Sequence, residues 1–308
     1  MFDYDVVIIG GGPAGLTAGL YLGRASHRIV ILDYEIPSSS YVKNLETIEN
    51  YPGFSGGVSG ASLISEMVTQ VKNYGGEFKQ ANVIGIENFS SCKWVKTDDG
   101  QCYTTAAVII AGGCHPQKLA VPGEEEFQGK GVFNCAFCDG GQFVERVVAV
   151  CGGGDSGVTE ALYMAKLASK VILIEAMPTL TASAVLREKA LTNSKLEIRC
   201  GVKVERIVGN HRVEAIELVE VVSGRKENLK VNGILVHIGL IPNTQYLNGI
   251  VPLDSQGQII VNNKMETEIP YIFAAGDIRS GSLRQISTAV GDGATAAIST
   301  VRLLQRAP

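Results

Sequence analysis

The feature that most constrains the fold is a glycine-rich loop that occurs twice. In each copy, an apolar run typical of a strand buried on both faces ends at the pattern GxGxxG. A helical segment follows, and then a second apolar run ends at an acidic residue. The first copy has a strand at 4–9, then Gly10, Gly12, Pro13, Ala14 and Gly15, and then Asp33, 18 positions after Gly15 (33 − 15). The second has a strand at 146–150, then Gly152, Gly154, Asp155, Ser156 and Gly157, and then Glu175, again 18 positions on (175 − 157).

These loops have the properties of nucleotide-binding loops. Glycines let the backbone approach a pyrophosphate, the helix N-terminus favours its negative charge, and the acidic residue accepts hydrogen bonds from ribose hydroxyls. A GxGxxG pattern alone also fits a plain tight turn between strand and helix. The flanking strands and the spacing of the acid favour dinucleotide binding, so the sequence predicts two such sites.

The order of the remaining elements predicts an insertion. The strand at 106–111 ends in Gly112-Gly113, and a second candidate crossing lies at Gly239–Asn243. We therefore expect an α/β fold with two Rossmann-like domains, the second inserted in the first. Residues 1–115 and 243–308 would form the discontinuous domain, and residues 116–242 the inserted one.

Composition excludes several classes of protein. The net charge of −4 is too mild for nucleic-acid binding. The seven cysteines are odd in number and scattered, unlike a secreted disulfide framework. The apolar strand begins at Tyr4 without a charged-then-apolar stretch before it, and no apolar run reaches about 18 residues, so we expect neither a leader segment nor a transmembrane helix. The expectation is a cytoplasmic protein that does not enter a membrane.

The chemistry is concentrated in Cys135-Ala136-Phe137-Cys138-Asp139-Gly140. Two thiols separated by two residues can form and open a disulfide, and a helix N-terminus lowers the pKa of such thiols. The alternative is half of a zinc site. Structural zinc usually needs four ligands, and the chain has no second CxxC and only four dispersed histidines. We therefore expect a redox pair and no metal.

The other cysteines are expected to be core or surface residues. Glu124–Glu126 is expected to form a solvated face.

Several motifs together carry a resemblance to a known family. Besides the two glycine loops and the CxxC box, they are Val121-Pro122-Gly123 followed by Gly131-Val132, the segment Gly239–Asn243, Ala275-Gly276-Asp277 and Arg284-Gln285. In this order the motifs resemble those of the low-molecular-weight thioredoxin reductases over nearly the whole chain.

The resemblance implies specific roles. The discontinuous domain would hold FAD, with Gly276-Asp277 at the ribityl-phosphate and Arg284, Gln285 and Ile286 at the start of a final helix that points to the isoalloxazine. Cys138 would face the flavin, Cys135 would attack the substrate disulfide, and Asp139 would act as the acid/base. Members of the family are usually homodimers that reduce thioredoxin or a similar small dithiol protein, and the two crossings would be hinges.

The second nucleotide site departs from the family pattern. Members that use NADPH carry a His-Arg-Arg cluster, followed shortly by another Arg, where this chain reads Glu175-Ala176-Met177-Pro178-Thr179-Leu180-Thr181-Ala182. Without those cations, a 2′-phosphate loses its charge-assisted hydrogen bonds, and Glu175 adds repulsion. The chain therefore resembles an NADPH-independent branch, such as the diflavin-linked disulfide oxidoreductases or the ferredoxin-dependent flavin thioredoxin reductases. We expect a second FAD or NAD(H) in the inserted domain, with ferredoxin a further candidate donor.

The segment after the first acid departs as well. Where the family has a Gly-Gly-Gln-Leu-like turn near the flavin, this chain has Pro37-Ser38-Ser39-Ser40-Tyr41. Two other functions remain open from the sequence. One is a dithiol oxidase that passes electrons through flavin to oxygen, and the other is a redox-sensing flavoprotein that binds a partner when its dithiol closes.

Overall fold

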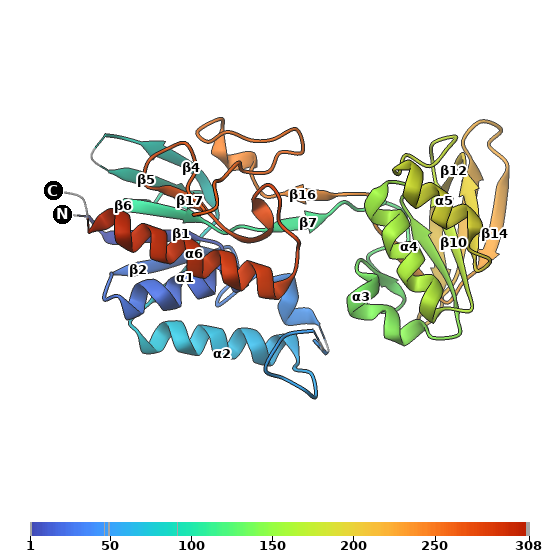
Figure 1. Cartoon of the computed structure of the whole chain (residues 1–308), viewed down its shortest axis with the longest axis horizontal. Helices are drawn as coiled ribbons and strands as arrows, with labels where there is room; N and C mark the ends of the chain where they lie inside the picture. Colours follow the sequence, from blue (N-terminus) through green and yellow to red (C-terminus); the bar gives the residue numbers. More distant parts are fainter. Residues whose placement is uncertain (1, 46, 49, 91, 306–308) are drawn as a thin grey trace. The chain divides into compact units, whose positions relative to one another are not determined.

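The protein forms two compact units (Figure 1). The computed structural model describes residues 2–45, 47–48, 50–90 and 92–305. One unit comprises Met1–His115 and Ile241–Pro308, and the other Pro116–Leu240. The chain thus leaves the first unit once and returns to it. The return lies at Ile241, two residues before the boundary expected at 243.

The first unit is built on a seven-stranded sheet in the order β3-β2-β1-β6-β5-β4, with β17 paired to β6. Parallel pairing of β1 with β2 and β6 explains why these strands are continuously apolar, since both of their faces are buried. The strands are β1 (Tyr4–Ile9), β2 (Ile29–Asp33), β3 (Glu77–Gln80), β4 (Val83–Asn88), β5 (Lys93–Thr97), β6 (Cys102–Ile110) and β17 (Ile272–Ala274).

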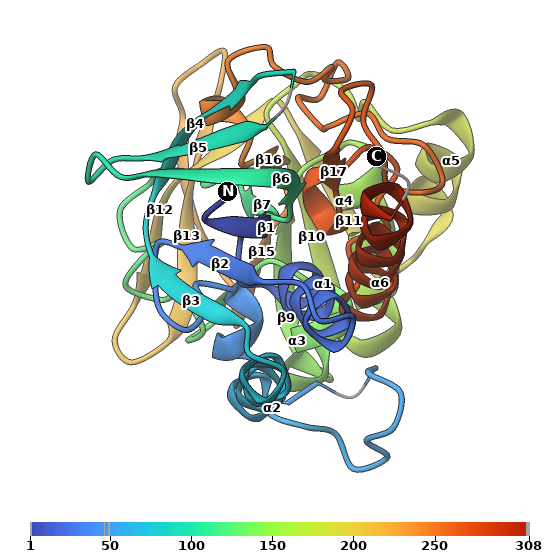
Figure 2. The same cartoon turned by 90° about the vertical axis from the view of Figure 1, so that its left-hand side faces the viewer.

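Helices α1 and α6 lie side by side in the first unit (Figure 2). A Cβ atom on Gly293 of α6 would lie 2.2 Å from the carbonyl oxygen of Ala14 in α1, so only glycine allows this approach. The contact brings the start of α1 next to α6. The helices are α1 (Pro13–Arg24), α2 (Gly60–Asn73) and α6 (Ile286–Leu304), with short 3₁₀ turns η1 (Tyr41–Asn44), η3 (Gln245–Leu247) and η4 (Gly276–Ile278).

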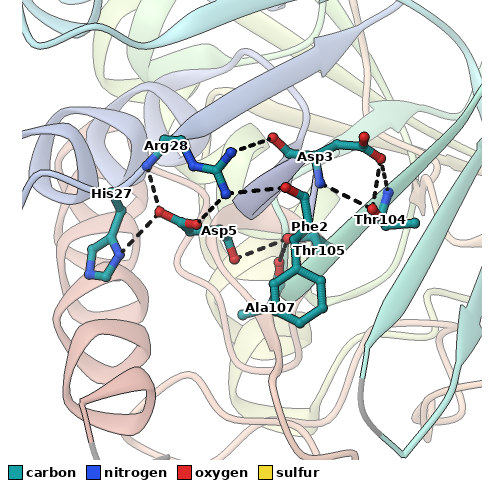
Figure 3. A network of polar contacts seen from close by, with 8 residues as sticks. All are labelled: Phe2, Asp3, Asp5, His27, Arg28, Thr104, Thr105 and Ala107. Carbon is teal, nitrogen blue, oxygen red and sulfur yellow. Dashed lines mark hydrogen bonds and ion pairs between the residues drawn. The ribbon is translucent and has the colours of Figure 1, made fainter.

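A polar network fixes the N-terminal end of β1 (Figure 3). The Arg28 guanidinium donates to Asp5 Oδ1 at 3.0 Å and to the carbonyl oxygens of Phe2 and Asp3. Asp3 Oδ2 accepts from both the backbone and the hydroxyl of Thr104, at 2.8 and 2.7 Å. The network joins the start of β1 to its neighbours β2 and β6, at the opposite end of β1 from the glycine loop.

The second unit contains two sheets. The first has five strands in the order β11-β10-β9-β15-β8, and the second three strands in the order β12-β13-β14. The strands are β8 (Val132–Phe133), β9 (Val147–Cys151), β10 (Lys170–Glu175), β11 (Leu196–Cys200), β12 (Val202–Gly209), β13 (Val213–Glu220), β14 (Lys226–Lys230) and β15 (Gly233–Val236). The helices are α3 (Ala136–Asp139), α4 (Asp155–Leu167), α5 (Ala184–Thr192) and the 3₁₀ turn η2 (Gly140–Phe143).

The two passages between the units pair with each other. They are β7 (Cys114–Pro116) and β16 (Leu240–Pro242), which form a two-stranded sheet. On the first-unit side, the amide of Asn243 donates to the carbonyl oxygen of Gly112 at 2.7 Å, and its Oδ1 lies 2.7 Å from His115 Nδ1. Asn243 therefore ties the outgoing passage to the returning one.

Some expectations from the sequence need correction. Glu124 is not part of a solvated face but is buried. Its carboxylate accepts the backbone N–H groups of Leu119 and Ala120 at 2.9 and 2.7 Å, and these hydrogen bonds compensate for the loss of water. Glu125 and Glu126 are exposed as expected. Helix α5 was not foreseen, since its apolar positions form no clear helical stripe. Within the described part of the chain, no helix is both long and apolar enough to cross a membrane.

Candidate active site

Cys135 and Cys138 form a disulfide, with their Cα atoms 5.4 Å apart. Cys135 is the N-cap residue of α3, and its Sγ accepts the backbone N–H of Cys138 at 3.1 Å. Cys138 and Phe137 are exposed, whereas Cys135 is partly buried. A thiolate on Cys135 would keep the donated N–H, which is the arrangement that activates a CxxC pair.

Asp139 ends the same helical turn, and its backbone N–H donates to the carbonyl oxygen of Cys135 at 3.1 Å. Its carboxyl group is therefore in the turn that carries both sulfurs. Glu160 was not foreseen from the sequence: its Oε2 accepts the backbone N–H of Ala136 at 2.5 Å. This contact places a second carboxylate at the dithiol, contributed by α4.

The first glycine loop is held by Asp33. Asp33 Oδ2 accepts the N–H of Gly11 at 2.6 Å, and Oδ1 accepts those of Glu35 and Ser39. Gly10 has φ +105°, and a Cβ atom on Gly15 would lie 1.9 Å from the Gly10 carbonyl oxygen, so both positions require glycine. Among the described residues, no side chain caps the start of α1 at Gly12. The backbone N–H groups in the first turn of α1 are therefore available to bind an anion.

A second turn meets this loop. Gly276 has φ +78°, and a Cβ atom there would lie 2.9 Å from Ala14 Cβ. Asp292 of α6 accepts the Gly276 N–H at 3.1 Å and pairs with Arg279, Oδ2 with Nε at 2.6 Å and Oδ1 with Nη2 at 2.8 Å. This buried ion pair fixes the turn against α6, and it too was missed from the sequence. The signal available was an acidic residue within a helix otherwise made of small and apolar residues.

The side chain of Asp277 is partly buried, and this burial raises the pKa of its carboxyl group. Its Oδ1 accepts the Ser282 hydroxyl at 2.9 Å. Burial also raises the pKa of the neighbouring Cys114 thiol to about 11, so this cysteine is a thiol at neutral pH. Arg284 has φ +57°, and its buried Nε has no hydrogen-bond partner within the described residues.

Gln285 and Ile286 start helix α6. Gln285 is the N-cap residue, and a reciprocal capping box joins it to Thr288. All eleven residues predicted to bind FAD belong to the first unit: six lie at its glycine loop, and the other five lie in the turn after β17 and at the start of α6 (Gly10, Gly12, Pro13, Ala14, Gly15 and Asp33; Gly276, Asp277, Arg284, Gln285 and Ile286). The uncapped N–H groups of α1, the Arg284 Nε without a partner and the buried Asp277 carboxyl fit a ligand that carries both phosphate and hydroxyl groups. A flavin dinucleotide has these groups.

The second glycine loop repeats this geometry. Glu175 Oε2 accepts the N–H of Gly153 at 2.6 Å, and a Cβ atom on Gly157 would lie 2.1 Å from the Gly152 carbonyl oxygen. No described side chain caps the start of α4 at Gly154. Asp155, also predicted to bind the cofactor, accepts the backbone N–H of Ser183 at its Oδ1, at 2.5 Å. Ser156 is exposed at the first turn of α4.

The segment after Glu175 folds over this loop. The backbone N–H groups of Thr181 and Ala182 donate to the Gly153 carbonyl oxygen at 2.9 and 3.0 Å. No Lys, Arg or His occurs between Glu175 and Arg187, and Arg187 is exposed on α5. The side chains closest to the loop along this segment are therefore uncharged or acidic. Among the described residues, no group of three or more His, Cys, Asp or Glu side chains is placed to hold a metal ion.

The chain is similar to known proteins over nearly its whole length. Residues 4–293 match the pyridine nucleotide-disulphide oxidoreductase family. The thioredoxin reductase of Bacillus subtilis (strain 168) is 39% identical over 297 residues, covering 96% of this chain and 93% of that protein. The thioredoxin reductase of Listeria innocua serovar 6a is 38% identical over 294 residues, covering 95% and 91%. The crystal structure of thioredoxin reductase from Streptococcus pyogenes MGAS5005 matches with a TM-score of 0.90 at 38% identity, covering 98% of both chains. The chain belongs to the thioredoxin reductase family.

Membership confirms the predicted α/β fold and the predicted class of enzyme. The protein is a flavin-dependent disulfide oxidoreductase of the thioredoxin reductase type. The family implies binding of FAD and of a nicotinamide nucleotide. The uncharged segment after Glu175 bears on which second nucleotide this chain accepts.

Proposed function

We propose that the protein reduces a disulfide of thioredoxin, or of a similar small dithiol protein, through Cys135 and Cys138. The observation that carries the proposal is the Cys135–Cys138 disulfide at the start of α3, in the same unit as a nucleotide loop. The relatives described above are named thioredoxin reductases, which supports thioredoxin as the substrate. We also infer a homodimer, which size-exclusion chromatography with light scattering would test.

In the reduced enzyme, the Cys135 thiolate attacks one sulfur of the substrate disulfide and forms a mixed disulfide. The other substrate sulfur leaves as a thiolate and takes a proton from Asp139. Cys138 then attacks Cys135 Sγ and passes its thiol proton to the Asp139 carboxylate, which restores the Cys135–Cys138 disulfide and the protonated Asp139 and releases the second substrate thiolate. The enzyme dithiol thus gives the substrate two electrons and, through Asp139, one proton, and the second substrate thiolate takes its proton from the solvent.

We assign FAD to the first unit, held by the Gly10–Gly15 loop, Asp33 and the Gly276-Asp277 turn, with Arg284, Gln285 and Ile286 at the start of α6. When bound, FAD supplies a two-electron donor and acceptor matched to a disulfide. The chain contributes the uncapped N–H groups of α1 and the Asp277 carboxylate, and we assign Cys138 as the sulfur that exchanges electrons with the flavin.

We further propose that NADPH is not the electron donor. Glu175 is anchored to Gly153, and Asp155 places a second carboxylate at the same loop. Two acidic groups oppose a 2′-phosphate, and residues 176–186 offer no Lys, Arg or His to bind one, whereas a free ribose diol can donate to Glu175. The inserted unit would then hold a second FAD or NAD(H), and ferredoxin is a further donor.

A donor-independent assay tests the proposed reaction. The flavin is reduced anaerobically with light and a deazaflavin, and the appearance of thioredoxin thiols is measured. We expect two thiols per flavin reduced, no reaction with Cys135→Ser, and with Cys138→Ser only thioredoxin held in a mixed disulfide, without release of the reduced protein. Thioredoxin that stays oxidised, while air rapidly reoxidises a dithiol-reduced flavin, would instead indicate a dithiol oxidase.

The donor is tested separately. NADPH at micromolar concentration should leave the flavin spectrum unchanged under anaerobic conditions. Nucleotide released from the denatured protein is then counted. Two FAD per chain supports a second flavin, and one FAD leaves NADH or ferredoxin. Fast bleaching by NADPH would overturn this part of the proposal.

A further inference from the structure

A second carboxylate lies at the dithiol without a role in the reaction described above. Glu160 is partly buried in the second turn of α4, and its Oε2 accepts the Ala136 N–H at 2.5 Å. Because Ala136 N is bonded to Cys135, covalent geometry keeps the distance from this oxygen to Cys135 Sγ below roughly 7–8 Å. The negative charge is therefore close to the sulfur that attacks the substrate.

The start of α3 and the carboxylate act on the sulfur in opposite directions. The N–H groups two and three residues after an N-cap are the ones that reach its side chain, and here Cys138 N–H donates to Cys135 Sγ. The first N–H, that of Ala136, is directed to Glu160. A Cys135 thiolate thus keeps the hydrogen bond from Cys138 and faces the negative charge of Glu160 at the adjacent peptide group.

We propose that Glu160 is a positioning residue of the dithiol: its carboxylate holds the first turn of α3 against α4 and disfavours the thiolate form of Cys135. This inference rests on the proposed function, in which Cys135 is the attacking sulfur. A thiol whose pKa is near the ambient pH attacks disulfides faster than a strongly acidic one, because nucleophilicity falls as the pKa falls. Glu160 therefore keeps Cys135 reactive as a nucleophile.

Other charged and titratable groups near Cys135 come from three elements. Asp139 belongs to α3 itself. From α4, Tyr163 places its ring 5.3 Å from that of Phe137, and Lys166 Nζ lies 6.0 Å from the Tyr163 ring centroid. After β15, His237 Nδ1 lies 3.4 Å from the carbonyl oxygen of Asn134. Glu160 is bonded directly to the peptide N–H next to Cys135, so its charge acts on the sulfur at short range.

The test is the pH dependence of alkylation at Cys135. It uses the full chain with bound flavin, reduced by dithiothreitol, freed of reductant anaerobically and exposed briefly to iodoacetamide. Trypsin releases residues 131–146, which contain both cysteines of the pair. Fragmentation of this peptide in a mass spectrometer reports the modification of Cys135 separately from that of Cys138. The Cys138→Ser background removes coupling between the two thiols.

Glu160→Gln keeps an acceptor for Ala136 N–H but removes the charge. We expect the midpoint of the Cys135 alkylation profile to fall by about one pH unit, as removal of one charge at this distance predicts. Glu160→Ala also removes the charge and should lower the midpoint by a similar amount, while it leaves Ala136 N–H without this acceptor. Glu188→Gln, on exposed α5, makes the same change in net charge and should leave the midpoint unchanged.

An unchanged or raised midpoint in Glu160→Gln, in a variant with wild-type flavin content and melting temperature, overturns the proposal. If only Glu160→Ala changed the profile, the contact would be structural and the charge without effect. The readout needs no thioredoxin. Failure to reduce thioredoxin would therefore contradict only the proposed function. An unshifted alkylation midpoint would contradict only the role given to Glu160.

Discussion

Glu175 is bonded to the backbone of the second glycine loop: its Oε2 accepts the N–H of Gly153 at 2.6 Å. Asp33 makes the equivalent 2.6 Å contact with Gly11 in the first loop. The two loops are thus equivalent in geometry and in the charge of the residue that would meet a ribose. A phosphate on that ribose would face a carboxylate in either site.

We predict that cations added beside the second loop will create affinity for a 2′-phosphate. Ala176 directly follows Glu175, and Thr181 donates its backbone N–H to the Gly153 carbonyl oxygen at 2.9 Å. Charge-assisted hydrogen bonds contribute about 1.5–3 kcal/mol each. The variant Ala176→Arg/Thr181→Arg should therefore bind 2′,5′-ADP at least about tenfold more tightly than the wild type, as measured by calorimetry.

The matched control is 5′-ADP, which lacks the 2′-phosphate and should gain much less. An Arg pair placed on exposed α5 (Val185→Arg/Leu191→Arg) tests whether charge alone is sufficient. Equal gains for both ligands, or tight binding of 2′,5′-ADP by the wild type, would contradict the role given to this segment.

The ion pair between Arg279 and Asp292 should be important for the stability of the first unit. The side chains are 16% and 9% exposed, and Asp292 also accepts the Gly276 N–H. Arg279→Met leaves this carboxylate buried without its cation, which typically costs about 3–5 kcal/mol. We expect a loss of this size in urea unfolding, together with weaker FAD retention.

A double variant separates charge burial from the anchoring of the turn. Arg279→Met/Asp292→Met removes both charges and should recover part of the lost stability. It should not recover FAD retention, because the second substitution removes the acceptor of the Gly276 N–H. Full recovery of both properties would show that Asp292 does not anchor the turn.

The Asp277 carboxylate should lower the thermal stability of the protein without FAD at neutral pH. With FAD bound, the same carboxylate should raise that stability. Burial raises the pKa of this carboxyl, so the folded protein binds the proton more readily than the unfolded chain does. The wild type therefore gains stability as the pH falls through the raised pKa towards about 4. Asp277→Asn, which does not titrate, should melt roughly 1–3 °C higher at pH 7.5.

This difference should disappear near pH 4, and added FAD should reverse it at pH 7.5. Thermal melts at both pH values, with and without FAD, measure both effects. Ser282→Ala removes the hydroxyl that donates to Asp277 and serves as a control that retains the carboxyl. A variant that melts below the wild type at pH 7.5 without FAD would contradict the sign of the effect.

The parts of the fold that could be predicted from the sequence are those defined by residues close together in the chain. The two glycine loops, their strands and the CxxC turn are each defined by neighbouring residues, and the structure has them within one or two positions of the expectation. Contacts between distant segments could not be predicted in this way. Glu124 looked like part of an acidic surface run, but its partners are the backbone groups of Leu119 and Ala120 in a turn with no regular period.

The same reason explains the residues missed in the site. Glu160 precedes no recognisable motif, and its partner Ala136 is 24 positions earlier in the chain. Arg279 and Asp292 become a pair only when the Gly276 turn packs on α6. Conversely, Asp155 belongs to a glycine motif, but its side chain binds Ser183 of a later segment. Motif membership identified the loop but not the direction of this carboxylate.

Phe137 should contribute to recognition of the protein substrate. It lies between the two cysteines and is 54% exposed, with its ring supported 5.3 Å from that of Tyr163. An exposed aromatic ring beside a reactive disulfide would be buried by a docked protein, and such residues often contribute more than 1 kcal/mol to binding. Phe137→Ala should raise the KM for thioredoxin by about five- to thirtyfold. The Phe137→Ala variant should reduce a small aromatic disulfide at a rate close to that of the wild type.

Phe89 provides a matched control, because it is 44% exposed and its ring lies 5.2 Å from that of Trp94. Phe89→Ala should leave both reactions unchanged. Equal losses with thioredoxin and with the small disulfide would mean that Phe137 supports the geometry of the dithiol rather than the docking of its partner.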